Sequence, residues 1–326
     1  MKTVFILGAG SSAELNYPGG PKLKERILTL LEKQNDSYKF LSEINSYEAV
    51  DDFVGRLRNA PLLPDTIDEF LEELHSVKSV RNVGRQAVAL AISYCESDNL
   101  HGMMGKQSWH HVFANYLRKN RQFIDSESFS FVTFNYDISL EHFLHASLTA
   151  VEVPHEILTR NFLDHSNLVH LHGQVGRLSW MKHDADFPSR KYGERIPKEN
   201  LHRVASRLLF PHEELDSKLV GETILNADCV VLLGFGFHDY NLKRIFFDEL
   251  IERSIPIFAT TFEMGKYNPD KLETLTENTN IRLFPMPCQE FMTGFVKHHK
   301  TRTLDSWYQK SPSNLEILGY KKIGTK

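Results

Sequence analysis

The chain has 326 residues and a formal net charge of −4, which argues against a bulk electrostatic partner such as bare duplex DNA, so we expect no direct nucleic-acid binding. Its three cysteines, Cys95, Cys229 and Cys288, stand far apart without a CxxC pair, which excludes a disulfide framework and a cysteine-rich zinc site. No apolar run approaches the roughly 20 residues that cross a bilayer, so we expect no membrane association and a cytoplasmic protein.

The first stretch, "MKTVFILGAGSSAELN", allows two interpretations. A secretory signal has this order of a basic residue, an apolar stretch and small residues. The apolar run is barely long enough for one, however, glycines interrupt it, and the charged stretch 14–24 follows without a break. The alternative is a buried strand that ends in a phosphate-binding turn, Gly8-Ala9-Gly10-Ser11-Ser12, and we favour it.

Such a turn brings the backbone close to an anion, points free N–H groups at it from the start of a helix, and adds two hydroxyl donors. The dinucleotide fingerprint GxGxxG is incomplete, because position 13 is alanine. A tight strand-to-helix turn without a ligand therefore stays open as the alternative for this segment taken alone.

Helical patterns fill about a hundred residues after the first strand, including "PKLKERILTLLEK", "TIDEFLEEL", "RQAVALAISYC" and "WHHVFANYLRK". In the first of these, Leu23, Ile27, Leu30 and Leu31 form one apolar stripe. This is too much chain for one crossover helix, so we expect a helical insertion over about 22–126 beside the sheet.

Five later apolar runs, each ended by a turn or polar cluster, predict further strands: Phe129–Phe134, Leu168–Leu171, Cys229–Leu233, Ile255–Thr260 and Ile281–Phe284. Near-continuous apolar runs are typical of strands covered on both faces. The predicted fold class is α/β, a Rossmann-like parallel sheet flanked by helices. A second insertion at about 176–215 is rich in charge and histidine and has no assigned structure, and 301–326 is expected to be a loose C-terminal tail.

Polar or glycine residues follow three of these strands, where ligands of open parallel sheets collect. "FVTFNYD" supplies Asn135 and Asp137, and "LVHLHGQVG" supplies His172. "VVLLGFGFHDYN" supplies the turn Gly234-Phe235-Gly236, followed by Asp239 and Asn241. Each has a structural alternative, since Asn135-Tyr136-Asp137 could form a turn and helix cap, and a lone histidine often only satisfies a strand end.

In this combination and order, the motifs resemble the sirtuin superfamily, specifically the prokaryotic SIR2-like proteins of antiphage defence. "GAGSS" matches the phosphate loop, "TFNYD" a Thr-Gln-Asn-Ile-Asp-type motif, "LHG" the segment with the catalytic histidine, and "GFGF" a Gly-Thr-Ser-type loop. "YPGGPKLKERI" and "TIDEFLEEL" look like the defence branch. The resemblance covers roughly residues 1–260, and it implies a SIR2-like NAD-binding catalytic domain, which we place at 1–300.

The resemblance implies cleavage of NAD+, as substrate, between nicotinamide and ribose. Asn135 would position the ribose or a water and His172 would be the general base, while Asp137 would offset developing positive charge or only cap a helix. Contacts to NAD+ would come from the strand-end residues, namely Gly8, Ala9, Gly10, Ser11, Ser12, Thr133, Gly234, Phe235, Gly236, Asp239 and Asn241.

Three functions stay open at this point. The first is an NAD+ hydrolase that depletes NAD+ in antiphage defence, and the pair Asn135 and His172 favours it because binding alone would not require both. The second is a nucleotide-binding sensor or scaffold without turnover. The third, a protein deacylase, is disfavoured because deacylases carry two CxxC pairs for zinc and this chain has none, so no metal is expected. The family also implies a homo-oligomer with a separately encoded partner, such as an ATPase or nuclease-like protein.

Overall fold

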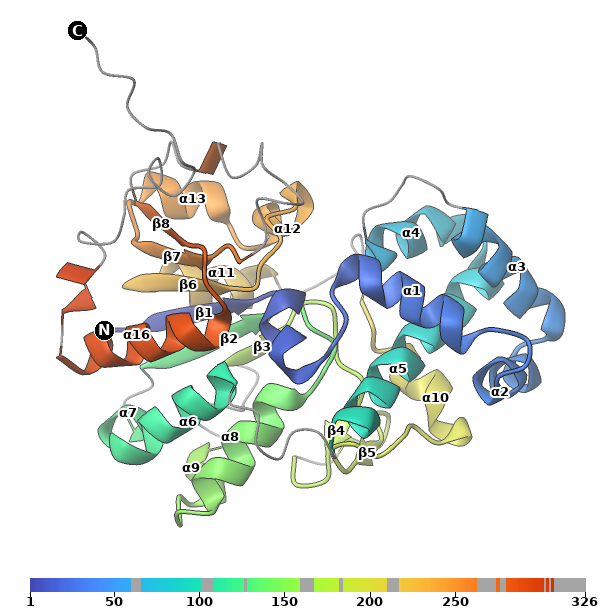
Figure 1. Ribbon diagram of the computed structural model, residues 1–326, viewed down its shortest axis with the longest axis horizontal. Coiled ribbons are helices and arrows are strands. Elements are labelled where there is room, and N and C mark those ends of the chain that lie inside the picture. The colour runs from blue at the N-terminus through green and yellow to red at the C-terminus, as the bar shows by residue number, and fades with distance from the viewer. Residues whose placement is uncertain are drawn as a thin grey trace, which may run out of the picture.

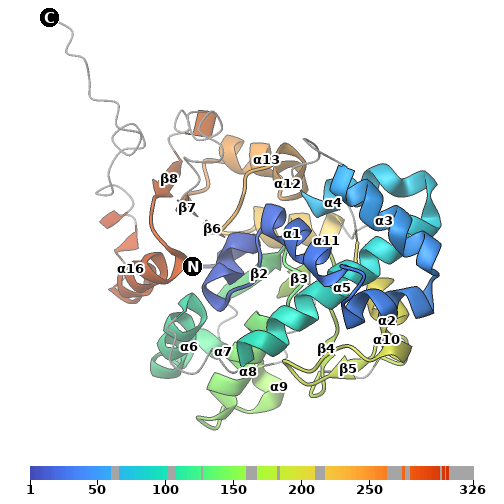
Figure 2. The same cartoon turned by 45° about the vertical axis from the view of Figure 1, so that its right-hand side comes forward.

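The computed structural model describes residues 1–59, 66–100, 108–125, 128–158, 167–181, 184–209, 217–262, 274–275, 280–301, 303–304 and 306–307. Figure 1 shows a central sheet with helices on both of its faces, and a separate group of helices to its right. Turning the molecule brings this group forward, with α5 running from it toward α8 (Figure 2).

The central sheet has six parallel strands in the order β3-β2-β1-β6-β7-β8. Their bounds are β1 Thr3–Leu7, β2 Phe129–Thr133, β3 Leu168–His170, β6 Cys229–Leu233, β7 Ile257–Thr260 and β8 Ile281–Phe284. This is the strand order of the doubly wound dinucleotide-binding fold. Successive strands are added toward one edge of the sheet from β1 to β3 and toward the other edge from β6 to β8, so the order reverses between β1 and β6. The predicted α/β class and parallel sheet are confirmed, although β2 and β3 end one residue earlier than expected and β7 begins two residues later.

Alternate residues of each strand enter two different cores, as the period of two requires. Phe5 faces a core that α6 (Trp109–Lys119), α8 (Ser139–Thr149) and α16 (Cys288–Thr301) cover, beside the short α7 (Gln122–Asp125) and α9 (His155–Leu158). Ile6 faces the opposite core, which α11 (Ser217–Leu225), α12 (Asp239–Arg244) and α13 (Phe247–Glu252) cover. Both faces of the sheet are therefore buried, which explains the near-continuous apolar strands.

The separate group of helices, here called the helical module, has its own core. It contains α1 Gly20–Leu30, α2 Asp36–Ile44, α3 Tyr47–Asn59, α4 Ile67–Glu73, the turn η2 Leu74–Ser76 and α5 Lys78–Leu100. The expected helical insertion is confirmed as part of the fold. One helix inside its expected range, α6, packs on the sheet, so the boundaries 22–126 stay a prediction.

The second expected insertion joins this module. It forms a short two-stranded ladder, β4 Arg177–Leu178 with β5 Ser189–Arg190, and then α10 Lys198–Ala205. Leu201 and Val204 of α10 enter the core of the helical module, where α10 packs on α5. Segments far apart in sequence thus complete one helical layer.

The beginning of the expected tail differs from a loose arm. Leu304 is 6% exposed and belongs to the core under α16. The Trp307 ring stacks on His298, with ring centroids 5.1 Å apart, and on Phe258, at 5.6 Å. The packing of these apolar side chains extends the fold past residue 301, while 308–326 lies outside the described residues.

The structure also describes the environment of the cysteines and the lengths of the apolar helices. Cys95, Cys229 and Cys288 are free and buried, as expected for small apolar side chains. Among the helices of the described residues, none is long and apolar enough to cross a bilayer.

We predict that Phe5→Ala lowers the free energy of unfolding by about 3–5 kcal/mol, because it removes a fully buried ring from a packed aromatic cluster. Phe5 contacts Phe113, Phe131 and Phe295 at centroid distances of 5.3, 5.4 and 5.5 Å. Urea unfolding measures the effect. The matched control is Phe262→Ala, at a ring that is 56% exposed, and an equal loss in both variants would contradict the prediction.

Candidate functional site

The loops after β1 and β6 touch backbone to backbone where the strand order reverses. The amide of Gly8 donates to the Leu233 carbonyl at 3.0 Å, and the amide of Gly10 donates to the Gly234 carbonyl at 3.0 Å. A Cβ on Gly234 would lie 2.0 Å from the Ser11 nitrogen, and Gly234 has a φ of +56°. These glycines are therefore required for close packing of the two loops, whatever ligand the loops bind.

The turn after β1 continues as a short 3-10 helix, η1 (Ala9–Leu15), which hydrogen bonds with two distant helices hold in place. The Glu14 carboxylate accepts from the backbone amides of Trp109, at 2.9 Å, and Gln289, at 2.7 Å. The Trp109 indole donates to the Ser11 carbonyl at 2.8 Å. The Glu14 carboxylate thus binds the first turns of both α6 and α16, an arrangement that local sequence patterns did not indicate.

Asn135, Ser11, Ser12 and Asp137 form one buried hydrogen-bond chain at the ends of β1 and β2. The Asn135 amide nitrogen donates to the hydroxyls of Ser11 and Ser12, both at 3.0 Å. The Ser12 hydroxyl donates in turn to the Asp137 carboxylate at 2.8 Å. The structure therefore brings together four of the residues that the sequence assigned to the site.

This chain determines which way the Asn135 amide points. The Asp137 carboxylate only accepts, so the Ser12 proton is directed to it and the Ser12 oxygen can only accept from Asn135. The NH2 group of Asn135 must then face the serines. Its carbonyl oxygen, Oδ1, is buried and has no hydrogen-bond partner among the residues that the structure describes. Asn135 therefore presents a fixed, unpaired acceptor.

Asp137 is fully engaged within the protein. Its Oδ2 accepts from Ser12, and its Oδ1 accepts from the backbone amide of Ser139, at 3.1 Å, and from the Ser139 hydroxyl. Burial raises the pKa of Asp137, and the hydrogen bonds from Ser139 and Ser12 oppose that rise. The geometry thus joins a helix-capping contact at α8 to the chain that orients Asn135.

His172 lies just past β3, and its side chain is packed between aromatic rings. It is 4% exposed, and its ring is 5.2 Å from that of Phe134 and 5.8 Å from that of Tyr136. Burial lowers the pKa of His172, the nearby Arg244 lowers it further, and Asp68 opposes the fall. Its Nε2 is buried and meets no hydrogen-bond partner in the described part of the chain. The ring also bonds the backbone of Phe134, so the other nitrogen, Nδ1, carries the proton. Nε2 therefore holds the free lone pair of a neutral imidazole.

The other residues predicted to bind NAD+ differ in how deeply they are buried around the hydrogen-bond chain. The Thr133 hydroxyl accepts from the backbone N–H of Asn135 at 3.0 Å. Phe235 is buried against Phe134, at 5.4 Å between ring centroids. Ala9, Gly10, Gly236 and Asp239 are exposed and Asn241 is partly buried.

Two further contacts near the site were not among the predicted residues. Tyr136 donates its hydroxyl to Asp68 of α4, which ties the loop after β2 to the helical module. Arg244, at the end of α12, donates to the Leu171 carbonyl at 2.9 Å. Both pairs join residues about 70 positions apart, so no short sequence window contains them.

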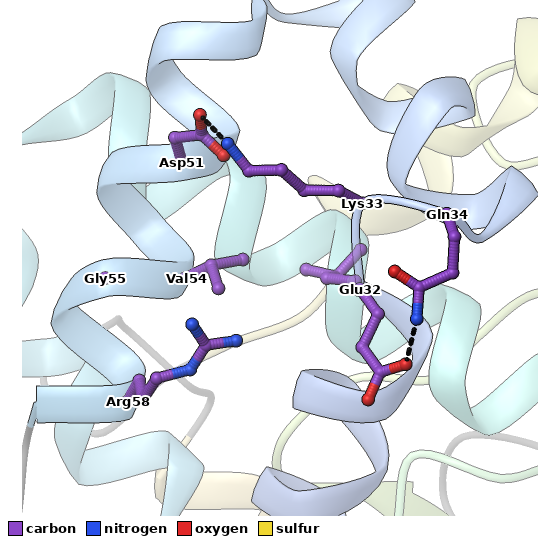
Figure 3. A pocket seen from close by; sticks show the side chains of 8 residues that line it. Glu32, Lys33, Gln34, Asp51, Val54, Gly55 and Arg58 are labelled. Atoms are coloured by element: carbon purple, nitrogen blue, oxygen red, sulfur yellow. Dashed lines mark hydrogen bonds and ion pairs between the residues drawn. The ribbon is translucent and has the colours of Figure 1, made fainter.

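The described residues at these strand ends form no metal-binding cluster, and they do not line the pocket found on the helical module. No cluster of three or more His, Cys, Asp or Glu side chains that could hold a metal occurs in the part of the chain that the structure describes. A pocket of about 600 Å³ lies on the helical module, where Glu32, Lys33 and Gln34 face Asp51 and Arg58 of α3 (Figure 3). The Lys33 ammonium there binds the Asp51 carboxylate at 2.9 Å.

The strand order defines a doubly wound α/β protein. Its polar strand ends lie where the strand order reverses, the position at which ligands of such folds usually bind. Residues 130–284 match the family model of the SIR2-like domain. This part of the chain therefore resembles the SIR2-like superfamily. A search of curated proteins finds no significant match.

We predict that Gly234→Ala destabilises the protein by at least about 2 kcal/mol, since the new Cβ would both clash with η1 and strain a left-handed backbone. Thermal unfolding measures the effect. The control is Gly55→Ala inside α3, where a Cβ meets nothing within 4 Å, and where alanine should stabilise by about 0.5–1 kcal/mol. A neutral Gly234→Ala would show that the two loops can separate freely.

Proposed function

We propose that this chain is an NAD+ glycohydrolase that cleaves the bond between nicotinamide and ribose. The observation that carries the proposal is a pair of buried, unpartnered polar atoms at adjacent strand ends, Asn135 Oδ1 and His172 Nε2. Buried polar atoms without partners are rare in native proteins and call for an explanation such as a missing ligand. At this edge of the sheet, the Asn135 oxygen could accept a hydrogen bond from a ribose hydroxyl or a water, and the His172 nitrogen could take its proton.

The residues match the needs of the reaction. The C–N bond breaks as its electron pair goes to the pyridinium nitrogen, so nicotinamide leaves as a neutral molecule and requires no acid. Water forms the new bond to the ribose carbon and gives up a proton, which His172 Nε2 can take because it is neutral. Asn135 Oδ1 can hold the water or a ribose hydroxyl in line, and its orientation is set in advance by Ser12 and Asp137.

The finer parts of the proposal rest on the family and not on this geometry. We propose that the enzyme acts in antiphage defence by depleting NAD+ in the cytoplasm. Free NAD+ cleavage would harm the cell, so the activity must be restrained until a signal arrives. A homo-oligomer and a separately encoded partner, such as an ATPase or nuclease-like protein, would supply that restraint.

We predict that His172→Ala and Asn135→Ala each reduce nicotinamide release from NAD+ by at least about a hundredfold, in line with the loss of a general base or a positioned reactant. The measurement is nicotinamide released by the purified chain, with folding checked by circular dichroism. His75→Ala, at an exposed histidine of the helical module, is the control. Full activity in both site variants would exclude the mechanism, whereas NAD+ binding without release by the native chain would favour a sensor.

We also predict that activity persists at pH values below the ordinary histidine pKa of 6.5, because burial lowers the pKa of His172 and keeps Nε2 free at mildly acidic pH. The base is active when neutral, so kcat/KM should fall only as pH drops through this lowered pKa. The pH profile of kcat/KM measures the acidic limb. A midpoint at or above 6.5 would contradict the assignment of His172.

A further inference from the structure

A second histidine on β3, His170, bonds directly to the backbone of Asn135. Its Nδ1 lies 3.1 Å from the Asn135 carbonyl oxygen, and its Nε2 lies 2.9 Å from Glu141 Oε1 of α8. The His170 side chain is 8% exposed and the Glu141 side chain 1%. The imidazole therefore forms a buried bridge between α8 and the residue that presents the unpaired acceptor.

Hydrogen-bond chemistry determines the charge of this bridge. A backbone carbonyl can only accept, so Nδ1 must carry a proton. The Glu141 carboxylate shares one more proton with Nε2, and that proton resides on imidazole because imidazole is the stronger base. Both ring nitrogens then donate, and His170 is an imidazolium paired with a carboxylate.

The charged groups around His170 agree with this assignment. Burial by itself would lower the pKa of His170, but the Glu141 carboxylate, the Asn135 carbonyl and the more distant Asp137 together raise it. Glu141 faces the ring from α8 and Asp137 from the loop after β2. His172, two residues further along the chain, has a lowered pKa. The pKa values of two histidines in one short segment are thus shifted in opposite directions, the pattern that separates acid and base roles in active sites.

We propose that His170, held as a cation by Glu141, is a positioning residue that fixes the Asn135 backbone so that the Asn135 side chain meets its substrate. Ser12 holds the Asn135 side chain from one direction, and His170 holds its main chain from another. Loss of the His170 charge removes the Nε2 proton that binds Glu141. The ring that donates to the Asn135 carbonyl then loses its charged anchor on α8, and the loop after β2 is held less firmly. The proposal rests on the proposed NAD+ cleavage for its kinetic test, and a spectroscopic test stands apart from it.

The kinetic test uses Glu141→Gln and His170→Gln in the full chain, with nicotinamide release followed from mildly acidic to mildly alkaline pH. In Glu141→Gln the pKa of His170 loses its main support, so activity should be near native at acidic pH and fall by about tenfold or more as pH rises through neutrality. His170→Gln cannot titrate, so it should lower kcat by about tenfold to a hundredfold with no new limb and little change in KM.

The matched controls are Glu222→Gln, at a side chain that is 61% exposed, and His75→Gln, at an exposed histidine. Both should keep the native pH profile. A purely structural role for the pair would lower the Glu141→Gln activity by the same factor at every pH. That result, or native activity in His170→Gln, would overturn the proposal while leaving the NAD+ hydrolase intact.

The spectroscopic test needs no activity. In the native chain with ¹⁵N-labelled histidine rings, the His170 signals, identified by their loss in His170→Gln, should show two protonated nitrogens throughout the neutral range. In Glu141→Gln one of these protons should be lost as pH rises. If the native chain cleaves no NAD+, these signals still decide the charge of His170, and a single protonated nitrogen at neutral pH overturns the inference. Should His170→Gln fail to fold, the shift in Glu141→Gln identifies the same signals.

Discussion

The backbone contact between Gly234 and the Gly10-Ser11 peptide determines where every other group of the site can lie. Neighbouring loops usually keep side chains between them, but here a Cβ on Gly234 would meet the Ser11 nitrogen at 2.0 Å. Because the contact places η1 against the end of β6, the hydroxyls of Ser11 and Ser12 face β2 and reach Asn135. The catalytic candidates are thus positioned by main-chain packing first and by side-chain hydrogen bonds second.

Polar pairs join the helical module to the site and tie distant segments of the module together. Tyr136 bonds Asp68, Tyr17 bonds Tyr192 at 2.8 Å between hydroxyls, and Arg190 pairs with Glu96 at 2.5 Å. Such pairs contribute little net stability, because burying their polar groups costs about as much as the contact returns. They are demanding in geometry, however, so their main effect is to specify one orientation of the module against the carboxyl edge of the sheet.

Much of this architecture follows from sequence patterns of short range. Apolar runs predicted all six strands of the sheet, and the polar residues after them include Ser11, Ser12, Asn135 and Asp137. The structure joins these four residues in one hydrogen-bond chain. The roles assigned to these residues stay predictions. Sequence patterns did not show the bridge from His170 to Glu141, since it depends on α8 lying beside β3. They also did not place α10 in the helical module, because that packing joins residues about a hundred positions apart.

Glu14 has an electrostatic consequence of its own. Each helix N-terminus carries the equivalent of about half a positive charge, and Glu14 accepts from the first turns of two helices, α6 and α16. Its single negative charge therefore balances the two helix ends almost completely. Glu14 and the two helix ends that it binds therefore carry almost no net charge together, and this group should neither attract nor repel a phosphate near η1.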